Sequence, residues 1–216
     1  MMRPLLLLLG IITLAVLWLV PWSALGVAPF STHMIVHIGL VAVAAPLLVL
    51  GIAGSQFDPV ARFASWFPPI PVSMAEFLVV WGWHTPLLHH AARQSHVALI
   101  AEQSLFLVTG LWLWFAVFGG AAAQRRQRAA TGIVALLLTS MHMTLLGALL
   151  VLAPRPLFEH GDGASGVTHL NTAALDDQQL GGTIMLIVGG LAYLAGGLGL
   201  TKLLLRSGDF RPRLSL

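Results

Sequence analysis

His33–Ile52 reads HMIVHIGLVAVAAPLLVLGI, a stretch of twenty residues that contains no Asp, Glu, Lys or Arg. An α-helix needs about 20 predominantly apolar residues to cross the hydrocarbon core of a bilayer, so this stretch predicts a transmembrane helix. Apolar runs of similar length recur along the chain, separated by polar segments or by segments rich in Pro and Gly. The expected spans are residues 5–25, 33–52, 72–88, 97–118, 129–152 and 180–205. The predicted fold class is all-α: one polytopic transmembrane helical bundle of about six spans over residues 1–216, with a basic tail at 206–216.

The composition agrees with a chain that has lipid as its main solvent. Hydrophobic residues make up 57% of the 216 positions and charged residues only 9%, whereas a soluble domain carries about 25% charged residues. The excess of 11 Lys and Arg over 8 Asp and Glu does not indicate nucleic-acid binding. These basic residues lie in short segments beside apolar runs, where they set membrane topology. Cys is absent, which excludes thiolate chemistry, iron–sulfur clusters and disulfides, and leaves His and Met as ligands for a soft metal.

The distribution of basic residues predicts the orientation of the spans. With both termini in the cytoplasm, six alternating spans place nine of the 11 Lys and Arg residues inside and leave only Arg93 and Arg155 outside. The nine are Arg3, Arg62, Arg125, Arg126, Arg128, Lys202, Arg206, Arg211 and Arg213. The run at 5–25 also has features of a signal peptide, but its length favours an uncleaved helix. Cleavage would leave five spans in the same orientation.

The segments between the spans carry turn and interface signals. Asp58–Pro71 contains four prolines and is expected to form a loop, with Trp66 at the level of the lipid headgroups. Pro86 is expected to bend or end the third span. Gln124–Arg128 is expected to be a basic loop, and the polar segment Ala153–Gln179 is expected to be the longest loop.

On this topology the nine histidines gather toward the non-cytoplasmic side of the membrane. None is placed in a cytoplasmic loop or tail, and the deepest lies in the fifth span, slightly past the midplane toward the outside. In chain order they are His33, His37, His84, His89, His90, His96, His142, His160 and His169. This layer of imidazoles predicts a metal site, because imidazole is the commonest metal ligand in proteins.

Two short stretches present histidines at positions suited to metal ligation. His33 and His37 are spaced i,i+4, so their rings lie on one helix face about one turn apart, a workable spacing for two ligands of one ion. The alternative is a pair of interfacial histidines that bond to loops or headgroups. His84, in WGWHTP, can serve as a ligand or meet the free carbonyls of the proline turn. His89 and His90 are expected near the water surface, where a structural role is favoured.

Two acidic residues fall inside the predicted spans. Glu102 lies about two turns into the fourth span, where an ionised carboxylate is costly unless it is paired or hydrated. It can ligate a metal, orient a ligand histidine, or stay protonated for packing. His96 precedes the same span but does not share its face with Glu102. Glu76 lies near the cytoplasmic start of the third span, where we expect it to be solvated or to help begin the helix.

The last two spans add further candidate ligands. Met141-His142-Met143 combines thioether and imidazole, which suits Cu(I), but neighbouring residues point about 100° apart on a helix. Only His142 with one of the methionines can therefore face one ion, and packing is the alternative for the methionines. Asp177 is placed at the outer start of the sixth span, where it either caps the helix or faces the histidine layer. Glycine pairs about every seven residues in this span predict close helix packing.

Five short motifs, in order along the chain, resemble the CtaG family of bacterial cytochrome c oxidase assembly factors, in a short form. They are STHMIVH at Ser31–His37, APLLVLG at Ala45–Gly51, WHTP at Trp83–Pro86, LGALL at Leu146–Leu150 and DQQLGGTIM at Asp177–Met185. The resemblance implies a multi-pass protein of the bacterial plasma membrane that is needed to make active haem–copper oxidase, with a role at the copper stage. The family pattern falls on His33, His37, His84, His96, His142 and Asp177.

Two positions depart from the family pattern. The family often has Gln where this chain has Val36, and His where it has Gln103. The second departure puts in doubt any site that needs an imidazole at position 103.

The leading interpretation is a non-enzymatic membrane assembly factor that binds copper at the outer membrane face and assists its delivery to the oxidase. The residues expected to ligate the metal or support its ligands are His33, His37, His84, His142, Asp177, Glu102, His96 and Met143. Copper is expected because of the resemblance and the available methionines, since His alone does not distinguish copper from zinc. The expected partners are the lipid bilayer and cytochrome c oxidase subunits or other copper chaperones, and not nucleic acid.

Three other functions stay open at this point. One is a haem-binding membrane electron carrier, in which paired histidines clamp the haem. Another is a membrane metalloenzyme with Glu102 as general base. The third is a metal-free scaffold for oxidase biogenesis, whose histidines bind partner loops. A Soret band would indicate haem, and metal analysis with His33 and His37 replaced by alanine separates the scaffold from the copper protein.

Overall fold

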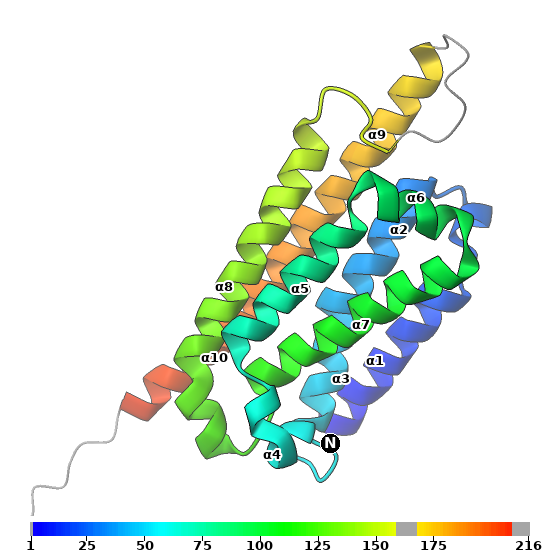
Figure 1. Cartoon of the computed structure of the whole chain (residues 1–216). Coiled ribbons are helices and arrows are strands. Elements are labelled where there is room, and N and C mark those ends of the chain that lie inside the picture. The colour runs from blue at the N-terminus through cyan, green and yellow to red at the C-terminus, as the bar shows by residue number, and fades with distance from the viewer. Residues whose placement is uncertain (1, 159–167, 209–216) are drawn as a thin grey trace, which may run out of the picture.

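The computed structural model describes residues 2–158 and 168–208, and within those residues it contains helices and no strand (Figure 1). Five helical segments are long and apolar enough to cross a membrane, and a bent pair of shorter helices makes a sixth candidate. The predicted all-α bundle of membrane-spanning helices is confirmed. The five long segments are Met2–Leu19, Pro29–Ile52, His96–Phe118, Ala122–Leu152 and Thr172–Leu205.

The first span, α1 (Met2–Leu19), is shorter than the predicted run. The chain turns at Pro21 into a short 3₁₀ helix, η1 (Trp22–Leu25), because a proline cannot continue the helical hydrogen bonding. α1 packs along the second span at Gly51, where an added Cβ would come within 2.5 Å of the Leu7 side chain. The missing side chain is what lets the two backbones approach closely.

The second and last spans each contain a π-helical stretch. The second span consists of α2 (Pro29–Ile38), η2 (Gly39–Ala44) and α3 (Ala45–Ile52). Pro46 stands at the start of α3 and has no N–H, so regular α-helical bonding is interrupted there. The last span consists of α9 (Thr168–Ile184), η4 (Met185–Gly189) and α10 (Gly190–Gly208).

The third span is the bent one. Its bend is 83°, and it separates Pro59–Trp66 from the longer helix Pro69–Trp83. Pro86 is the first residue of the next helix, where its missing N–H costs nothing, so the prediction that this proline ends the span is confirmed. The elements here are α4 (Pro59–Phe63), η3 (Ala64–Trp66), α5 (Pro69–Trp83) and α6 (Pro86–Gln94).

Three segments predicted as loops are helical over much of their described length, and the loop predictions are wrong there. Asp58–Pro71 contains α4, η3 and the start of α5. α9 already begins at Thr168, inside the segment expected to be the longest loop, and Asp177 therefore lies in its third turn rather than at its start. Gln124–Arg128 lies in the first turns of α8 (Ala122–Leu152) rather than in a loop. In α8 and α9 the reason is that hydropathy marks where a helix enters the bilayer, whereas the helix itself continues into the aqueous layer. In Asp58–Pro71 the prolines stand at the starts of α4 and α5, where proline is tolerated.

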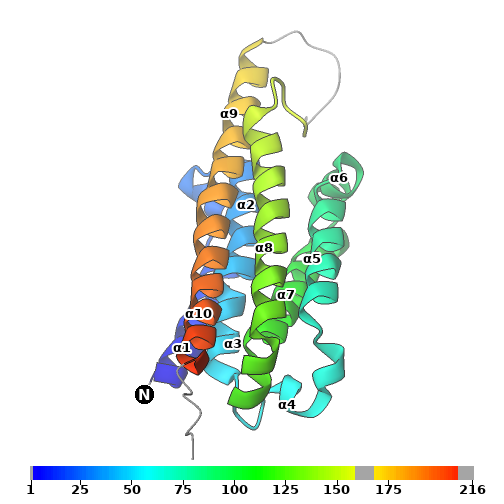
Figure 2. The ribbon, with the colours of Figure 1, turned by 90° about the vertical axis from the view of Figure 1, so that its left-hand side faces the viewer.

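The fold brings the histidine-bearing elements together at one end of the bundle. α6 and the start of α2 lie at that end, whereas α4 and the N-terminus lie at the opposite end (Figures 1 and 2). α7 (His96–Phe118) follows α6 and packs against both α5 and α6. α2, α5, α6 and α7 together surround the region in which the predicted site residues meet.

Candidate metal centre

The first turn of α2 is held in place by Asp177 of α9. The two carboxylate oxygens accept hydrogen bonds from the Phe30 N–H at 2.8 Å and the Ser31 N–H at 2.9 Å, and the Ser31 hydroxyl donates a third. These N–H groups belong to the free donors that every helix start presents. Asp177 therefore caps the neighbouring α2, a role that differs from both predicted roles. This cap fixes the turn from which His33 projects.

His33 and His37 point from α2 into the bundle. Their side chains are 4% and 0% exposed, and their rings stack at 11° with centroids 6.2 Å apart. The i,i+4 spacing thus places both rings on one buried helix face, as predicted.

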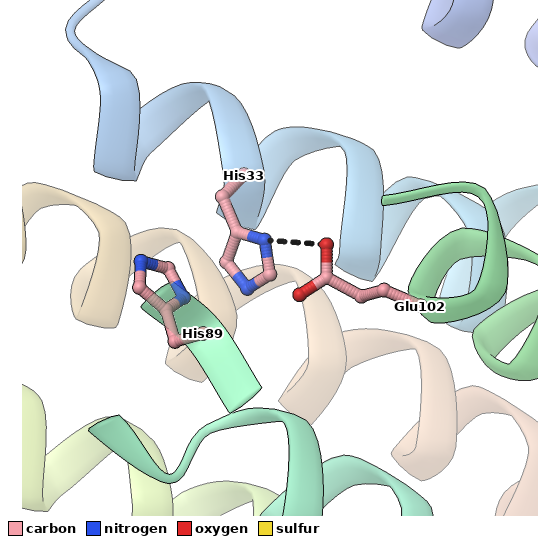
Figure 3. Close-up of side chains that lie close together, drawn as sticks. All are labelled: His33, His89 and Glu102. Carbon is pink, nitrogen blue, oxygen red and sulfur yellow. Dashed lines mark ion pairs between the residues drawn. The ribbon is translucent and has the colours of Figure 1, made fainter. Parts of the chain in front are cut away.

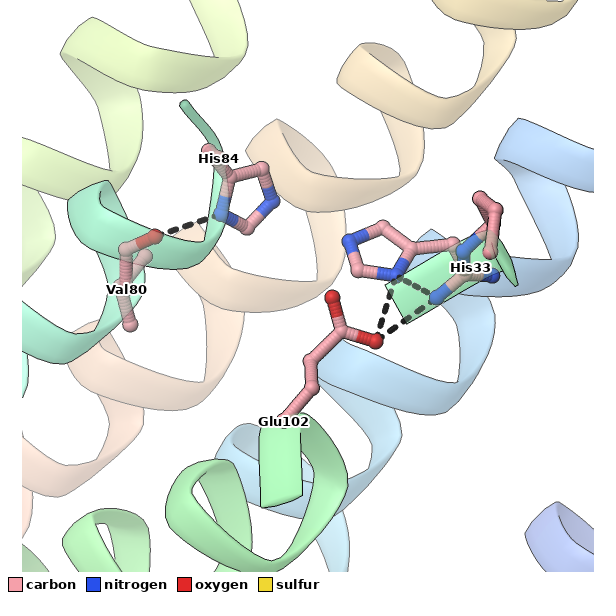
Figure 4. Close-up of polar contacts among 5 residues, drawn as sticks. His33, Val80, His84 and Glu102 are labelled. Carbon is pink, nitrogen blue, oxygen red and sulfur yellow. Dashed lines mark hydrogen bonds and ion pairs between the residues drawn. The ribbon is translucent and has the colours of Figure 1, made fainter. Parts of the chain in front are cut away.

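His84 joins this pair from the end of α5. It is the C-terminal capping residue of that helix, and its Nδ1 lies 2.7 Å from the Val80 carbonyl oxygen (Figure 4). Because a carbonyl only accepts, Nδ1 carries the proton and Nε2 carries the lone pair. Its ring centroid lies 5.3 Å from that of His33 and 5.1 Å from that of His37. His84 is therefore oriented by its backbone contact as a metal-ligating histidine typically is.

His89 is the site residue that sequence reasoning missed. It was expected near the water surface, yet it is only 3% exposed, and its ring stands perpendicular to that of His33 with centroids 4.9 Å apart. α6 folds back over the bundle end and buries His89 and Ala92, whereas His90 stays exposed. The signal was present in the sequence: His89, Ala92 and Arg93 share one face of this short amphipathic helix at i,i+3 and i,i+4 spacing.

Glu102 of α7 completes the group. Its carboxylate is buried, its Oε2 lies 3.5 Å from the His33 Nδ1, and the same oxygen accepts a hydrogen bond of 2.7 Å from Arg93. His33, His89 and Glu102 each offer one ligand atom, and these atoms all lie within 4.8 Å of one another. Figure 3 shows the three side chains converging from α2, α6 and α7. Two members of this trio, His33 and Glu102, had been predicted as ligands from the sequence. They come from two different spans.

The donor set fits a metal ion. Among the described residues, the Nε2 atoms of His33 and His84 and both ring nitrogens of His37 are buried without a hydrogen-bond partner. Oε1 of Glu102 is also buried without one. Leaving buried polar atoms unpaired costs free energy, and several of them in one place call for an unseen partner such as an ion or water. Imidazole with carboxylate is a donor set that copper and zinc both accept.

Phenylalanines form the walls around the histidines. Phe106 lies 4.1 Å from His37, and Phe158 lies 4.4 Å from His89, measured between ring centroids. Phe30 contacts both His33 and His89. A pocket of about 270 Å³ shares Phe30 and Phe158 with this wall. Apolar walls lower the local dielectric constant and so strengthen the interaction of any bound ion with its ligands.

The remaining predicted ligands are not part of the group of His33, His89 and Glu102, although His142 is close enough to His37 for their charges to interact. His142 of α8 is buried, its ring lies 5.3 Å from that of Phe77, and neither ring nitrogen has a hydrogen-bond partner among the described residues. Met143 is also buried, whereas Met141 is 54% exposed. His96 is exposed at the first turn of α7. His160 lies outside the described residues.

Glu76 corrects a prediction. It was expected to be solvated or to help begin the third span, but its side chain is fully buried in the middle of α5. Its oxygens accept hydrogen bonds from the Thr139 hydroxyl at 3.2 Å and the Tyr193 hydroxyl at 3.3 Å, and Thr139 also contacts Ser73 at 3.0 Å. The partners come from two distant spans, α8 and α10. Because such contacts depend on how the spans pack, the position of Glu76 within its own span could not reveal them.

Comparison with known proteins identifies a family. A family model described as cytochrome c oxidase caa3 assembly factor (Caa3_CtaG) matches residues 1–207. No curated protein and no solved structure matches the chain.

Proposed function

The chain belongs to the family of cytochrome c oxidase caa3 assembly factors, and from that premise we propose that it binds a copper ion in its buried histidine cluster and assists delivery of the ion to the oxidase. We define the histidine cluster as His33, His37, His84, His89 and Glu102. An assembly factor works on another protein, and this supports a non-catalytic role. The partners would be oxidase subunits or other copper chaperones.

The observation that carries this proposal is the convergence of His33, His89 and Glu102 within 4.8 Å from three separate helices. His37 and His84 border this trio with buried nitrogens that have no partner among the described residues. An ion could therefore meet more than one set of neighbouring ligands within the cluster. That arrangement suits an ion that is passed on better than one that is held permanently, because a closed set of four ligands is typical of structural metal sites.

Copper is proposed over zinc because of the family, since the cluster chemistry admits both metals. A haem is less favoured. The His33 ring lies against those of His84 and His89, at centroid separations of 5.3 and 4.9 Å. Imidazoles in such direct contact leave no room for a macrocycle between them.

The cluster is proposed to face the outside of the bacterial plasma membrane. Most described basic residues lie toward the opposite end of the bundle. Arg3 and Arg125, for example, approach the same Gly54, and each has a guanidinium nitrogen 3.5 Å from where a Cβ would stand. The positive-inside rule then assigns that end to the cytoplasm.

The test is elemental analysis of the detergent-purified protein after anaerobic loading with Cu(I). The wild-type chain should retain copper after desalting, and His33→Ala should lose most of it. His96→Ala is the matched control, because His96 is an exposed histidine outside the cluster, and it should retain copper as the wild type does. Absence of copper in the wild type would favour the metal-free scaffold, and a Soret band would favour haem.

A second experiment tests delivery. Cells that lack the gene should be complemented by the wild type and by His96→Ala, but not by His33→Ala or His89→Ala. The quantity to measure is the copper content of the purified oxidase relative to its haem content. Full copper content with the His33 and His89 variants would show that the cluster does not serve delivery.

A further inference from the structure

Arg93 occupies the histidine cluster as a cation. It lies on α6 one turn after His89, and its Nη2 is 2.7 Å from the Glu102 Oε2 and 3.3 Å from the His33 Nδ1. Glu102 is 1% exposed, whereas the Arg93 side chain is 21% exposed. Two of the three residues that could hold a metal are therefore already engaged by one guanidinium, which still reaches the surface.

The contact with His33 determines which nitrogen of that ring carries the proton. A guanidinium has only donors, so Nη2 donates and Nδ1 accepts. A neutral imidazole has a single lone pair, and here that lone pair points at Arg93, which leaves the proton on Nε2. Neither nitrogen of His33 can then bind a metal. Ligation through Nδ1 needs the lone pair that now accepts from Arg93, and ligation through Nε2 needs the proton to move to Nδ1. Either way, the hydrogen bond from Arg93 has to break first.

Electrostatics point the same way. Arg93 and Glu102 form a pair of opposite charges in which the carboxylate is buried, so the guanidinium already neutralises the carboxylate of the cluster. A metal cation that enters next to a retained guanidinium would meet strong repulsion, because like charges interact strongly in an apolar environment. A metal cation that replaces the guanidinium of Arg93 is attracted by the Glu102 carboxylate and is not repelled by a neighbouring positive charge.

We propose that Arg93 is a displaceable internal cation: it closes the copper site in the metal-free state, and it leaves His33 for the surface when the ion binds. This inference rests on the proposed function and adds how the site is controlled. Metal binding is thus an exchange of one cation for another. Entry requires the side chain of Arg93 to swing out, and release is assisted by its return.

The experiment compares Cu(I) affinity in detergent under anaerobic conditions, with Cu(I) buffered by a colorimetric chelator. Arg93→Gln should bind Cu(I) about tenfold more tightly than the wild type or better, because the competing charged hydrogen bonds are gone. Arg93→Lys keeps a cation and should stay closer to the wild type. Arg155→Gln makes the same charge change at an exposed arginine and should leave the affinity unchanged.

The direction of the change separates the exchange from a merely structural role. If Arg93 only positions Glu102 and His33, then Arg93→Gln weakens Cu(I) binding. Weaker or unchanged binding in this variant would overturn the proposal. Copper binding by the wild type with no response to Arg93→Gln would overturn the exchange alone, whereas a wild type without any copper binding would overturn the proposed function as well.

A second measurement uses the wild-type chain and does not depend on the folding of a variant. Phenylglyoxal modifies exposed arginines, and peptide mapping by mass spectrometry gives the rate at each one. Arg93 should be modified faster in the copper-loaded protein than in the metal-free protein, while the rate at Arg155 stays constant. An equal or slower rate at Arg93 after loading would contradict its displacement.

Discussion

The rings of His33, His37, His84 and His89 lie in contact inside a helical bundle, although they come from two helices, α2 and α6, and from the end of a third, α5. The sequence predicted His33 and His37 together because one helix face carries both. It also predicted His84 and Glu102 as separate candidates. The shared helix face of His89 and Arg93 is visible in the sequence, but their place beside His33 and Glu102 depends on α6 folding back across the end of the bundle, which the sequence does not show.

Glu76 gives a prediction about a buried carboxyl that lies outside the histidine cluster. No ion pair among the described residues includes it, and its partners are hydroxyl groups. Glu76→Gln keeps the shape and one acceptor oxygen and replaces the other oxygen by an NH2 group, which can donate to a hydroxyl oxygen, so the free energy of unfolding in detergent should change by less than about 1 kcal/mol. Glu76→Leu leaves the buried Tyr193 hydroxyl without its acceptor and should cost about 1–3 kcal/mol. Equal stability of the two variants would argue against this network.

Asp177 is predicted to stabilise the fold through α2. Asp177→Ala removes the acceptor for the Phe30 and Ser31 N–H groups and should lower the free energy of unfolding by about 1–2 kcal/mol. Copper affinity should fall as well, because His33 lies one turn beyond this cap. Asp176→Ala is the matched control, since Asp176 is exposed, and it should change neither quantity. Thermal unfolding in detergent and a Cu(I) titration give the two measurements.

The helices show which local signals carry over into structure and which do not. The length of the apolar runs predicted the spans Pro29–Ile52 and His96–Phe118. Pro86 was correctly predicted to end the third span. Helix ends outside the bilayer were missed, as at Thr168 in α9 and Ala122 in α8. Hydropathy carries no information there, because both polar loops and polar helices are solvated.

Close packing between α8 and α9 gives a prediction at a pair of facing glycines. A Cβ on Gly182 would lie 2.9 Å from the Leu150 Cβ and 3.0 Å from the Gly147 carbonyl oxygen, so the helices would have to separate. Gly182→Ala should therefore cost about 1–3 kcal/mol of stability. Gly197→Ala, on the same span, meets nothing within 4 Å and should be neutral or stabilising. Similar melting temperatures for the two variants would mean that the helices are not packed so tightly.

The histidine cluster and most of the described basic residues lie toward opposite ends of the bundle. α6, which carries His89, lies at one end, and the N-terminus and α4 lie at the other (Figure 2). The helical class and the number of spans could be predicted from apolar run lengths alone. Which side chains meet at the end of the bundle follows from helix packing, which a single sequence does not specify.

The absence of Cys makes the orientation of this bundle directly testable. Arg155→Cys and Arg126→Cys introduce single thiols at exposed positions on opposite sides of the predicted topology. In spheroplasts, a membrane-impermeant maleimide should label position 155 before lysis and position 126 only after lysis. The reverse pattern would place the histidine cluster in the cytoplasm and remove the basis for delivery on the outer side.

The most direct test of the copper cluster is X-ray absorption at the copper edge of the anaerobically loaded protein. We predict nearest neighbours that are nitrogen and oxygen, with the outer-shell scattering of several imidazoles. In the double variant His33→Ala/His89→Ala, this imidazole signal should be lost or strongly reduced, while the control His90→Ala/His96→Ala should keep it. Copper with an unchanged spectrum in the cluster variant, or no bound copper in the wild type, would contradict the account.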